Sequence, residues 1–214
     1  MINGKKVLAI VPARAGSKRV KNKNLKKICS KPLIDYSLVE AKKSKFIDKI
    51  FVSTDSKAIS KESRKFGLQP EFLRPKKFST HFTNSETVIL YLLKKFKVHN
   101  FVYFILLQPT SPLRTTKDID RSIKYFANKN LNTLVSVKKI KDIKTKSRFY
   151  LVKKKASKKN FKLNGAIYIS SVKHFLKKKN FNSTKLIYYI MSKKRSLDID
   201  TNRDFKEAKK IIAS

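Results

Sequence analysis

The fold is decided by the stretch Val7-Leu8-Ala9-Ile10-Val11-Pro12-Ala13-Arg14-Ala15-Gly16-Ser17-Lys18-Arg19, which Lys23 and Asn24 follow closely. Its first five residues are apolar and predict a strand buried in a parallel sheet. The small residues and cations after it can form a loop whose backbone N–H groups and basic side chains surround anionic oxygens. The stretch therefore indicates a phosphate-binding loop at the end of a strand, with a solvated basic loop as the open alternative.

Apolar runs of strand length alternate with amphipathic segments of helix length along the rest of the chain. We expect strands at residues 49–53, 71–73, 101–107, 134–137 and 165–169. Helices are expected at 32–41, from the N-cap Ser56 to Gly67, from Asn84 through Leu93, from Thr116 through Phe126, at 172–177, and after a capping box of Thr201 and Asp204. This order predicts a single domain over residues 1–214, with a three-layer α/β/α fold and a mostly parallel, mixed sheet.

Residues 138–162 interrupt this alternation. They are dense in lysine and show little helical period. We expect them to form a short protruding arm within the domain.

The composition is strongly basic, with 53 Lys and Arg against 14 Asp and Glu, a formal charge of +39. Such a charge favours polyanionic partners, but the lysines are scattered through the predicted helices and loops, as the drift of an AT-rich genome would produce. Both explanations stay open, so nucleic acid is expected at most as a nonspecific partner. No apolar run approaches the ~20 residues that cross a bilayer, and no membrane partner is expected. The single cysteine, Cys29, and an N-terminus unlike a secretory signal favour the cytoplasm.

Polar clusters follow three of the predicted strands, at 14–18, 53–55 and 108–114. Each alone is more often a turn than a site. Parallel strands bring their carboxyl ends to one edge of the sheet, where ligands of such folds bind. The three clusters together therefore predict one crevice.

Asp198 and Asp200 are separated by one apolar residue. In an extended segment both carboxylates face the same way, about 6–7 Å apart, which suits Mg²⁺ shared with substrate phosphates. Two exposed acids on an edge strand are the alternative. The histidines His81, His99 and His174 lack the spacing of zinc ligands.

At this point the chain resembles the acylneuraminate cytidylyltransferases, the CMP-sialic acid synthetases, over nearly its whole length. The motifs that carry the resemblance occur in the family's order: Ala13-Arg14-x-Gly16-Ser17-Lys18 with Lys23-Asn24, Val52-Ser53-Thr54-Asp55, Leu73-Arg74-Pro75, Gln108-Pro109-Thr110-Ser111-Pro112-Leu113-Arg114, Asn164-Gly165-Ala166-Ile167-Tyr168 and Asp198-Ile199-Asp200-Thr201. The resemblance implies a fold of the nucleotide-diphospho-sugar transferase type. It also implies a Mg²⁺-dependent reaction in which the anomeric hydroxyl of a nine-carbon 2-keto sugar acid attacks CTP, giving a CMP-sugar and pyrophosphate.

The resemblance assigns roles to individual residues. The triphosphate would be held by Arg14, Ser17, Lys18 and Lys23. The cytosine or ribose would be contacted by Asn24, Arg74 and Ser85, and the sugar acid by Gln108, Asn164 and Tyr168. Magnesium would be bound by Asp198 and Asp200, one of which would help to deprotonate the attacking hydroxyl. The expected catalytic residues are Arg14, Lys23, Asp198 and Asp200.

Two features depart from the family pattern. His81 stands where an acidic residue is usual, and the arm at 138–162 is shortened and lacks the Arg-Gln pair often found before Asn164. In the family this arm crosses a homodimer and completes the partner's sugar pocket. A homodimer is therefore expected, while the identity of the sugar acid stays open.

Two functions of other classes remain as alternatives. A degenerate relative could bind RNA or another polyanion through its lysines without turnover, and its affinity would fall steeply with salt. A purely structural homologue would leave the polar clusters without a purpose.

Overall fold

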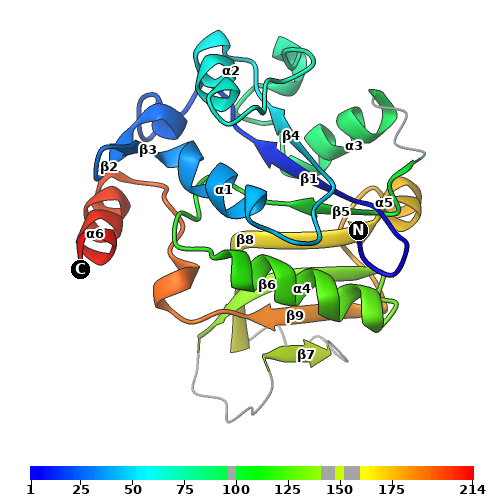
Figure 1. The fold of residues 1–214 in the computed structure, drawn as a ribbon. Coiled ribbons are helices and arrows are strands. Elements are labelled where there is room, and N and C mark those ends of the chain that lie inside the picture. Colours follow the sequence, from blue (N-terminus) through cyan, green and yellow to red (C-terminus); the bar gives the residue numbers. More distant parts are fainter. Residues whose placement is uncertain (96–99, 141–147, 152–159) are drawn as a thin grey trace.

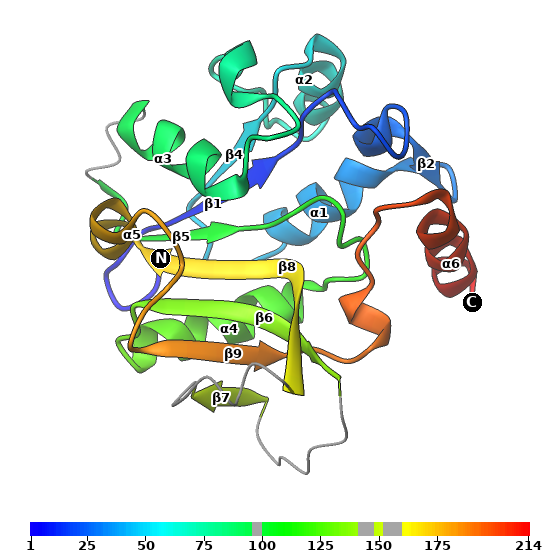
Figure 2. The same cartoon turned by 180° about the vertical axis from the view of Figure 1, so that it is seen from behind.

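A computed structural model describes residues 1–95, 100–140, 148–151 and 160–214 of the chain. The central sheet has seven strands in the order β4-β1-β5-β8-β6-β9-β7 (Figures 1 and 2). Their bounds are Val7–Pro12 for β1, Lys49–Ser53 for β4, Tyr103–Leu106 for β5, Thr133–Lys139 for β6, Phe149–Leu151 for β7, Phe161–Ser171 for β8 and Leu186–Ile190 for β9. β8 and β7 run antiparallel to their neighbours, and the other pairings are parallel. The expected mixed, mostly parallel sheet is confirmed.

Helices cover both faces of the sheet, which gives the expected three layers. Their bounds are Leu33–Lys42 for α1, Lys57–Arg64 for α2, Ser85–Lys95 for α3, Thr116–Asn128 for α4, Val172–Lys178 for α5 and Asn202–Ala213 for α6. Side chains of α1, α2 and α4 share one buried apolar cluster, and those of α3 and α5 share another. α6 packs apart from both, against the small hairpin of β2 (Lys27–Ile28) and β3 (Lys31–Pro32) (Figure 1).

The position of β1 in the fold explains why residues 7–11 are all apolar. Val7, Ala9 and Val11 enter the cluster beneath α1 and α4, whereas Leu8 and Ile10 enter the cluster beneath α3 and α5. A strand buried on both faces has no polar side, so its residues do not alternate. The strand thereby fixes the basic loop at its carboxyl end, between β4 and β5.

The caps predicted from the sequence are confirmed. The Ser56 hydroxyl accepts a hydrogen bond from the N–H of Ile59, and the Asn84 carboxamide from that of Thr87. Thr201 and Asp204 form the expected capping box at the start of α6. Together with the elements at 32–41, 49–53, 116–126 and 172–177, these details were readable from local pattern.

The strand expected at residues 71–73 is wrong. The structure has bends and loop there, because Phe72 packs its ring against Phe51 at 5.6 Å and Tyr91 at 6.1 Å instead of extending along an edge. The segment after it is held by one hydrogen bond from the N–H of Arg74 to the carbonyl of Thr54.

Two strands of the central sheet and the two short strands β2 and β3 were not predicted from the sequence. β9 lies between β6 and β7 and is parallel to β6, and β7 closes that edge of the sheet. Part of the expected arm at 138–162 lies outside the described residues. Of its described parts, Lys138 and Lys139 pair with Lys162 and Phe161 as a continuation of β6 and β8, and β7 belongs to the sheet. None of the helices in the described ranges is long and apolar enough to cross a membrane.

Candidate active site

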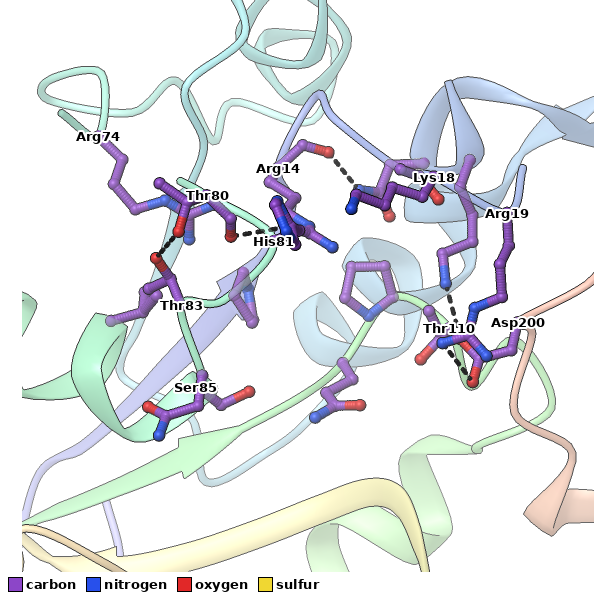
Figure 3. Close-up of a pocket in the computed structure, with 18 of the residues that line it drawn as sticks. Arg14, Lys18, Arg19, Arg74, Thr80, His81, Thr83, Ser85, Thr110 and Asp200 are labelled. Carbon is purple, nitrogen blue, oxygen red and sulfur yellow. Dashed lines mark hydrogen bonds and ion pairs between the residues drawn. The ribbon is translucent and has the colours of Figure 1, made fainter. Parts of the chain in front are cut away.

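A cavity of about 560 Å³ opens at the carboxyl ends of β1 and β5 (Figure 3). Four segments line it: the basic loop after β1, the loop of residues 78–85 before α3, the turn after β5, and the acidic segment before α6. All but two of the expected site residues lie on its wall, namely Arg14, Ser17, Lys18, Lys23, Asn24, Arg74, Ser85, Gln108, Asp198 and Asp200. The structure thus brings residues from both ends of the chain into one cavity.

Backbone hydrogen bonds hold the basic loop in place. The N–H of Ala13 donates to the carbonyl of Ser53 at 2.8 Å, and the N–H of Ala15 donates to the Asp55 carboxylate at 2.8 Å. The buried Asn24 carboxamide donates to the carbonyl of Arg14 at 2.9 Å. Because these contacts use the backbone, the side chain of Lys18 stays exposed and available to an anion. The 53–55 cluster after β4 therefore supports the loop and does not itself line the cavity.

Two arginines hold the loop of residues 78–85, Arg14 from the basic loop and Arg74 through a further contact to Ser53 of β4. The Arg14 guanidinium donates to the carbonyl of Thr80 at 2.8 Å (Figure 3). Arg74 is buried, and its guanidinium donates to the hydroxyls of Ser79 and Ser53 at 3.0 and 3.4 Å. Burial lowers the pKa of Arg74, while the nearby Asp55 carboxylate opposes that shift. Both arginines thus hold the wall of the cavity.

The basic loop and the acidic segment meet directly, although they are 177 residues apart in the chain. The Lys23 ammonium donates to the carbonyl of Ile199 at 2.8 Å and to the Asp200 carboxylate at 3.1 Å. The Arg19 guanidinium forms an ion pair with the other oxygen of Asp200 at 3.4 Å (Figure 3). Of the three clusters predicted to form one crevice, those at 14–18 and 108–114 line the cavity together with the acidic segment, and the one at 53–55 does not.

The acidic segment is not a strand, contrary to the expected extended strand at Asp198 and Asp200. A 3₁₀ turn at Lys194–Ser196 leads into an irregular stretch. The side chains still point alternately to opposite sides, although the segment pairs with no strand. Ile199 is fully buried in the cluster beneath α6, while both carboxylates line the cavity.

Asp198 has the surroundings of a cation ligand. Burial raises the pKa of its carboxyl group, and a hydrogen bond from the Thr110 hydroxyl opposes that shift. Its Oδ1 atom is buried and has no hydrogen-bond partner among the described residues. A buried carboxylate oxygen without a partner is costly, and a bound cation would remove that cost. With the half-exposed Asp200 beside it, the pair fits Mg²⁺, which binds through one or two carboxylates and completes its shell with water and phosphate oxygens.

The described residues contain no group of three or more His, Cys, Asp or Glu side chains that could hold a metal ion. A structural zinc or calcium cage is therefore not formed by them. The two aspartates are consistent with an ion that substrate helps to hold.

Arg114 stabilises the turn after β5, a role that the sequence analysis did not assign to it. Its guanidinium is buried and donates to the carbonyls of Gln108 and Ala166 at 3.0 and 2.8 Å and to the Ser37 hydroxyl at 2.7 Å. Burial lowers its pKa to about 10. The contact ties the Gln108 turn to β8 and to α1, and so fixes one wall of the cavity.

Gly165 allows that wall to approach the acidic segment. Its φ is +73°, and a Cβ atom at this position would lie 2.8 Å from Oε1 of Gln108 and 3.9 Å from Oδ2 of Asp198. Any larger residue would push on Gln108 and would strain the backbone. Steric crowding thus explains why glycine occupies this position of the Asn-Gly-Ala-Ile-Tyr motif.

Asn164 and Tyr168 do not line the cavity. Asn164 is 3% exposed, and its carboxamide is engaged by Ser136 and Ser196. The Tyr168 ring packs against Phe181 at 5.0 Å, and burial raises the pKa of its hydroxyl to about 12. The structure places both residues of β8 beside the cavity wall, where they face protein instead of open space.

The sequence analysis missed several lining residues. Arg19, Thr80, Thr83, Asn84 and Thr110 line the cavity but were not among the expected site residues. His81 also lines it and was noted only as a departure from the family pattern. The signal for most of them was the polar run before the helix that Asn84 caps. That run reads as ordinary capping sequence until its position beside Arg14 is known.

Comparison with known proteins agrees with this geometry. The family model described as cytidylyltransferase matches residues 8–213. The chain is 33% identical to the N-acylneuraminate cytidylyltransferase of Escherichia coli O18:K1:H7 over 95% of its length, but it spans only about half (51%) of that relative. It is also 33% identical to the CMP-N,N'-diacetyllegionaminic acid synthase of Legionella pneumophila, over 97% of this chain and 96% of the relative.

The fold is similar to that of a solved CMP:2-keto-3-deoxy-manno-octonic acid synthetase in complex with CTP. The TM-score is 0.75 at 15% identity, covering 98% of this chain and 99% of the other. With the family match over nearly all of the sequence, the conclusion is direct: this chain belongs to the cytidylyltransferase family.

Proposed function

We propose that the chain transfers a cytidylyl group from CTP to a nine-carbon 2-keto sugar acid, releasing pyrophosphate. The observation that carries the proposal is the contact of Lys23 with Asp200 inside the cavity, because it unites phosphate-binding cations with metal-binding carboxylates. The names of the relatives, which act on N-acylneuraminic and legionaminic acids, support this class of acceptor.

The cations of the basic loop account for nucleotide binding. Arg14, Ser17, Lys18 and Lys23 would surround the triphosphate, and Asn24, Arg74 and Ser85 would contact the nucleoside. Phosphoryl transfer needs mainly positioning and neutralisation of charge, which these groups supply without covalent catalysis. In the reaction, a bond forms between the anomeric oxygen of the sugar acid and the α-phosphorus, and the bond from that phosphorus to the pyrophosphate oxygen breaks.

Asp198 and Asp200 would hold Mg²⁺, which when bound neutralises phosphate charge and orients the triphosphate. The raised pKa of Asp198 also makes its carboxylate a candidate acceptor for the hydroxyl proton of the sugar acid. Gln108, which lines the cavity beside Gly165 and near Asp198, would contact the sugar acid.

We further propose a homodimer and a cytoplasmic site of action. The resemblance of the chain to a family of homodimers supports the first, and the single cysteine together with a nucleotide substrate supports the second. Light scattering at two protein concentrations tests the dimer, and a mass of one chain at both would contradict it.

A pyrophosphate-release screen tests the function. Each of the four nucleoside triphosphates is paired with a panel of 2-keto sugar acids in Mg²⁺. We expect release only with CTP and only with a subset of the acids. Release with no combination, together with RNA binding that weakens steeply with salt, would support instead the polyanion-binding alternative that the charge of +39 favours.

A further inference from the structure

Asn164 lies behind the acidic segment and joins two parts of the chain through one carboxamide. Its Oδ1 accepts hydrogen bonds from the N–H of Ala166 at 3.2 Å and from the Ser136 hydroxyl at 2.5 Å. Its Nδ2 donates to the Ser196 hydroxyl at 2.9 Å. Because a backbone N–H can only donate, the bond from Ala166 fixes which side of the carboxamide is oxygen, and so the amino group must face Ser196.

Ser196 connects this contact to the metal-binding carboxylates. It is 3% exposed, ends the 3₁₀ turn, and is separated from Asp198 only by Leu197. The turn is fixed on its other side by the ion pair of Arg195 with the buried Asp118 at 3.1 Å. The short path from Ser196 to Asp198 leaves little freedom for the carboxylate once the turn is held.

Gly165 adds a second contact from the same motif. Its α-carbon faces both Gln108 and the Oδ2 atom of Asp198, as the position of a Cβ there shows. Asn164 therefore holds the turn before Asp198, and its neighbour sets how closely the carboxylate and Gln108 approach each other.

We propose that Asn164 is a positioning residue for the metal-binding segment, acting through Ser196. This role rests on the proposed function, since it assumes that Asp198 and Asp200 hold a cation that CTP shares. A carboxylate held in place before the ion arrives binds it more tightly, which is why hydrogen-bond partners of metal ligands matter for affinity.

Two buried serines offer a matched test, because both bond to Asn164 but only one belongs to the acidic segment. Ser196→Ala removes the link to the segment, and Ser136→Ala removes the link to β6. Calorimetry measures the affinity for CTP once with Mn²⁺ and once with EDTA, without sugar acid. The ratio of the two affinities, the metal-dependent gain, isolates the contribution of the carboxylates.

We expect Ser196→Ala to lower the metal-dependent gain by about three- to tenfold while the affinity in EDTA stays within about twofold. Ser136→Ala is expected to keep the gain within about twofold. Thermal unfolding of both variants checks that each is folded, and Ser136→Ala should lose more stability, because the Ser136 hydroxyl also accepts a hydrogen bond from the N–H of Ile167 at 2.7 Å.

Three results would overturn the role. An unchanged gain in Ser196→Ala would remove the link, and an equal loss in both serine variants would indicate general loosening. An Asn164→Ala variant that raises only the KM for the sugar acid, with the gain intact, would make Asn164 a substrate contact. A wild-type chain that binds CTP with no metal-dependent gain would instead refute the metal site of the proposed function, and this role with it.

Discussion

The basic loop of residues 13–24 and the acidic segment of residues 196–200 line the same cavity, but the chain holds them differently. In the loop, the side chains of Lys18 and Arg19 are exposed, that of Arg19 by 68%. In the acidic segment, Ser196 and Ile199 are buried and Asp198 is largely enclosed, while the Asp200 side chain is 41% exposed. The difference indicates that the Asp198 carboxylate is fixed before ligand arrives, whereas the cations of Lys18 and Arg19 can adjust to phosphate. Fixed groups suit a metal with demanding geometry, and adjustable ones suit a flexible triphosphate.

The largest effect is expected on the fixed side, from Asp198→Asn. The change keeps the shape but removes the charge that a cation requires, so turnover should fall by at least about 10³-fold in pyrophosphate release. A matched control is Glu71→Gln, which alters an exposed acid paired with Lys49 and should change turnover by less than about twofold. Retention of more than a tenth of the turnover by the Asp198 variant would show that this carboxylate is not a required ligand.

Arg114→Met tests the rigidity of the wall behind the fixed side. The variant leaves the carbonyls of Gln108 and Ala166 without their buried donor, and we expect the free energy of unfolding to fall by about 3–4 kcal/mol. Urea denaturation measures the loss, with Arg203→Met on the exposed face of α6 as the control within about 0.5 kcal/mol. Equal losses in the two variants would contradict the structural role of Arg114.

Asp35→Asn tests α1, the helix that contains Asp35 and packs against the turn Lys23–Leu25 at the end of the basic loop. Burial, and secondly the charge of Glu62, raise the pKa of Asp35 to about 6. Because the folded-state pKa is raised, this group favours folding below about pH 4, and that contribution is lost as pH rises through 6. The Asn variant should match the wild type in stability at pH 4 and exceed it by about 2–3 kcal/mol at pH 7.5. Chemical denaturation at both pH values provides the measurement, and a constant difference between them would exclude this titration.

Lys23→Ala tests the cationic loop at the lysine that contacts the acidic segment. Loss of one charge-assisted contact to phosphate should weaken CTP binding by about 10- to 100-fold, while stability changes little. Lys21→Ala is the matched control, because this exposed lysine of the same loop does not line the cavity. Its CTP affinity should stay within about twofold, and similar losses in both variants would mean that only net charge matters.

Much of the fold could be predicted from local pattern. β1, β4, α1 and α4 have clear apolar runs or caps, and their packing follows from alternation. The strand at 71–73 was predicted wrongly because an aromatic residue that packs sideways looks, in sequence, like one in a strand. β9 was missed because its short apolar run follows a long lysine-rich stretch and has no flanking cap to mark it.

The charged residues of the candidate site could be predicted from the sequence, but the buried residues that hold them in place could not. Asp198 and Asp200 are conspicuous in a chain poor in acids, and the basic loop follows a clear strand. The sequence does not reveal that Arg114 faces inward, or that Asn164 bonds to serines 28 and 32 residues away. These contacts depend on the order of strands in the sheet, which local pattern does not specify.

Asp200→Asn gives the most direct test of the central claim, that one pocket joins the cationic loop to the metal-binding carboxylates. In EDTA, loss of the charge that pairs with Lys23 and Arg19 should free both cations and tighten CTP binding by about two- to fivefold. In Mg²⁺, the same variant should bind CTP at least about tenfold more weakly, because a metal ligand is lost. Calorimetry in the two buffers should therefore measure changes in CTP affinity of opposite sign. A change of the same sign in both, or none in either, would contradict the claim.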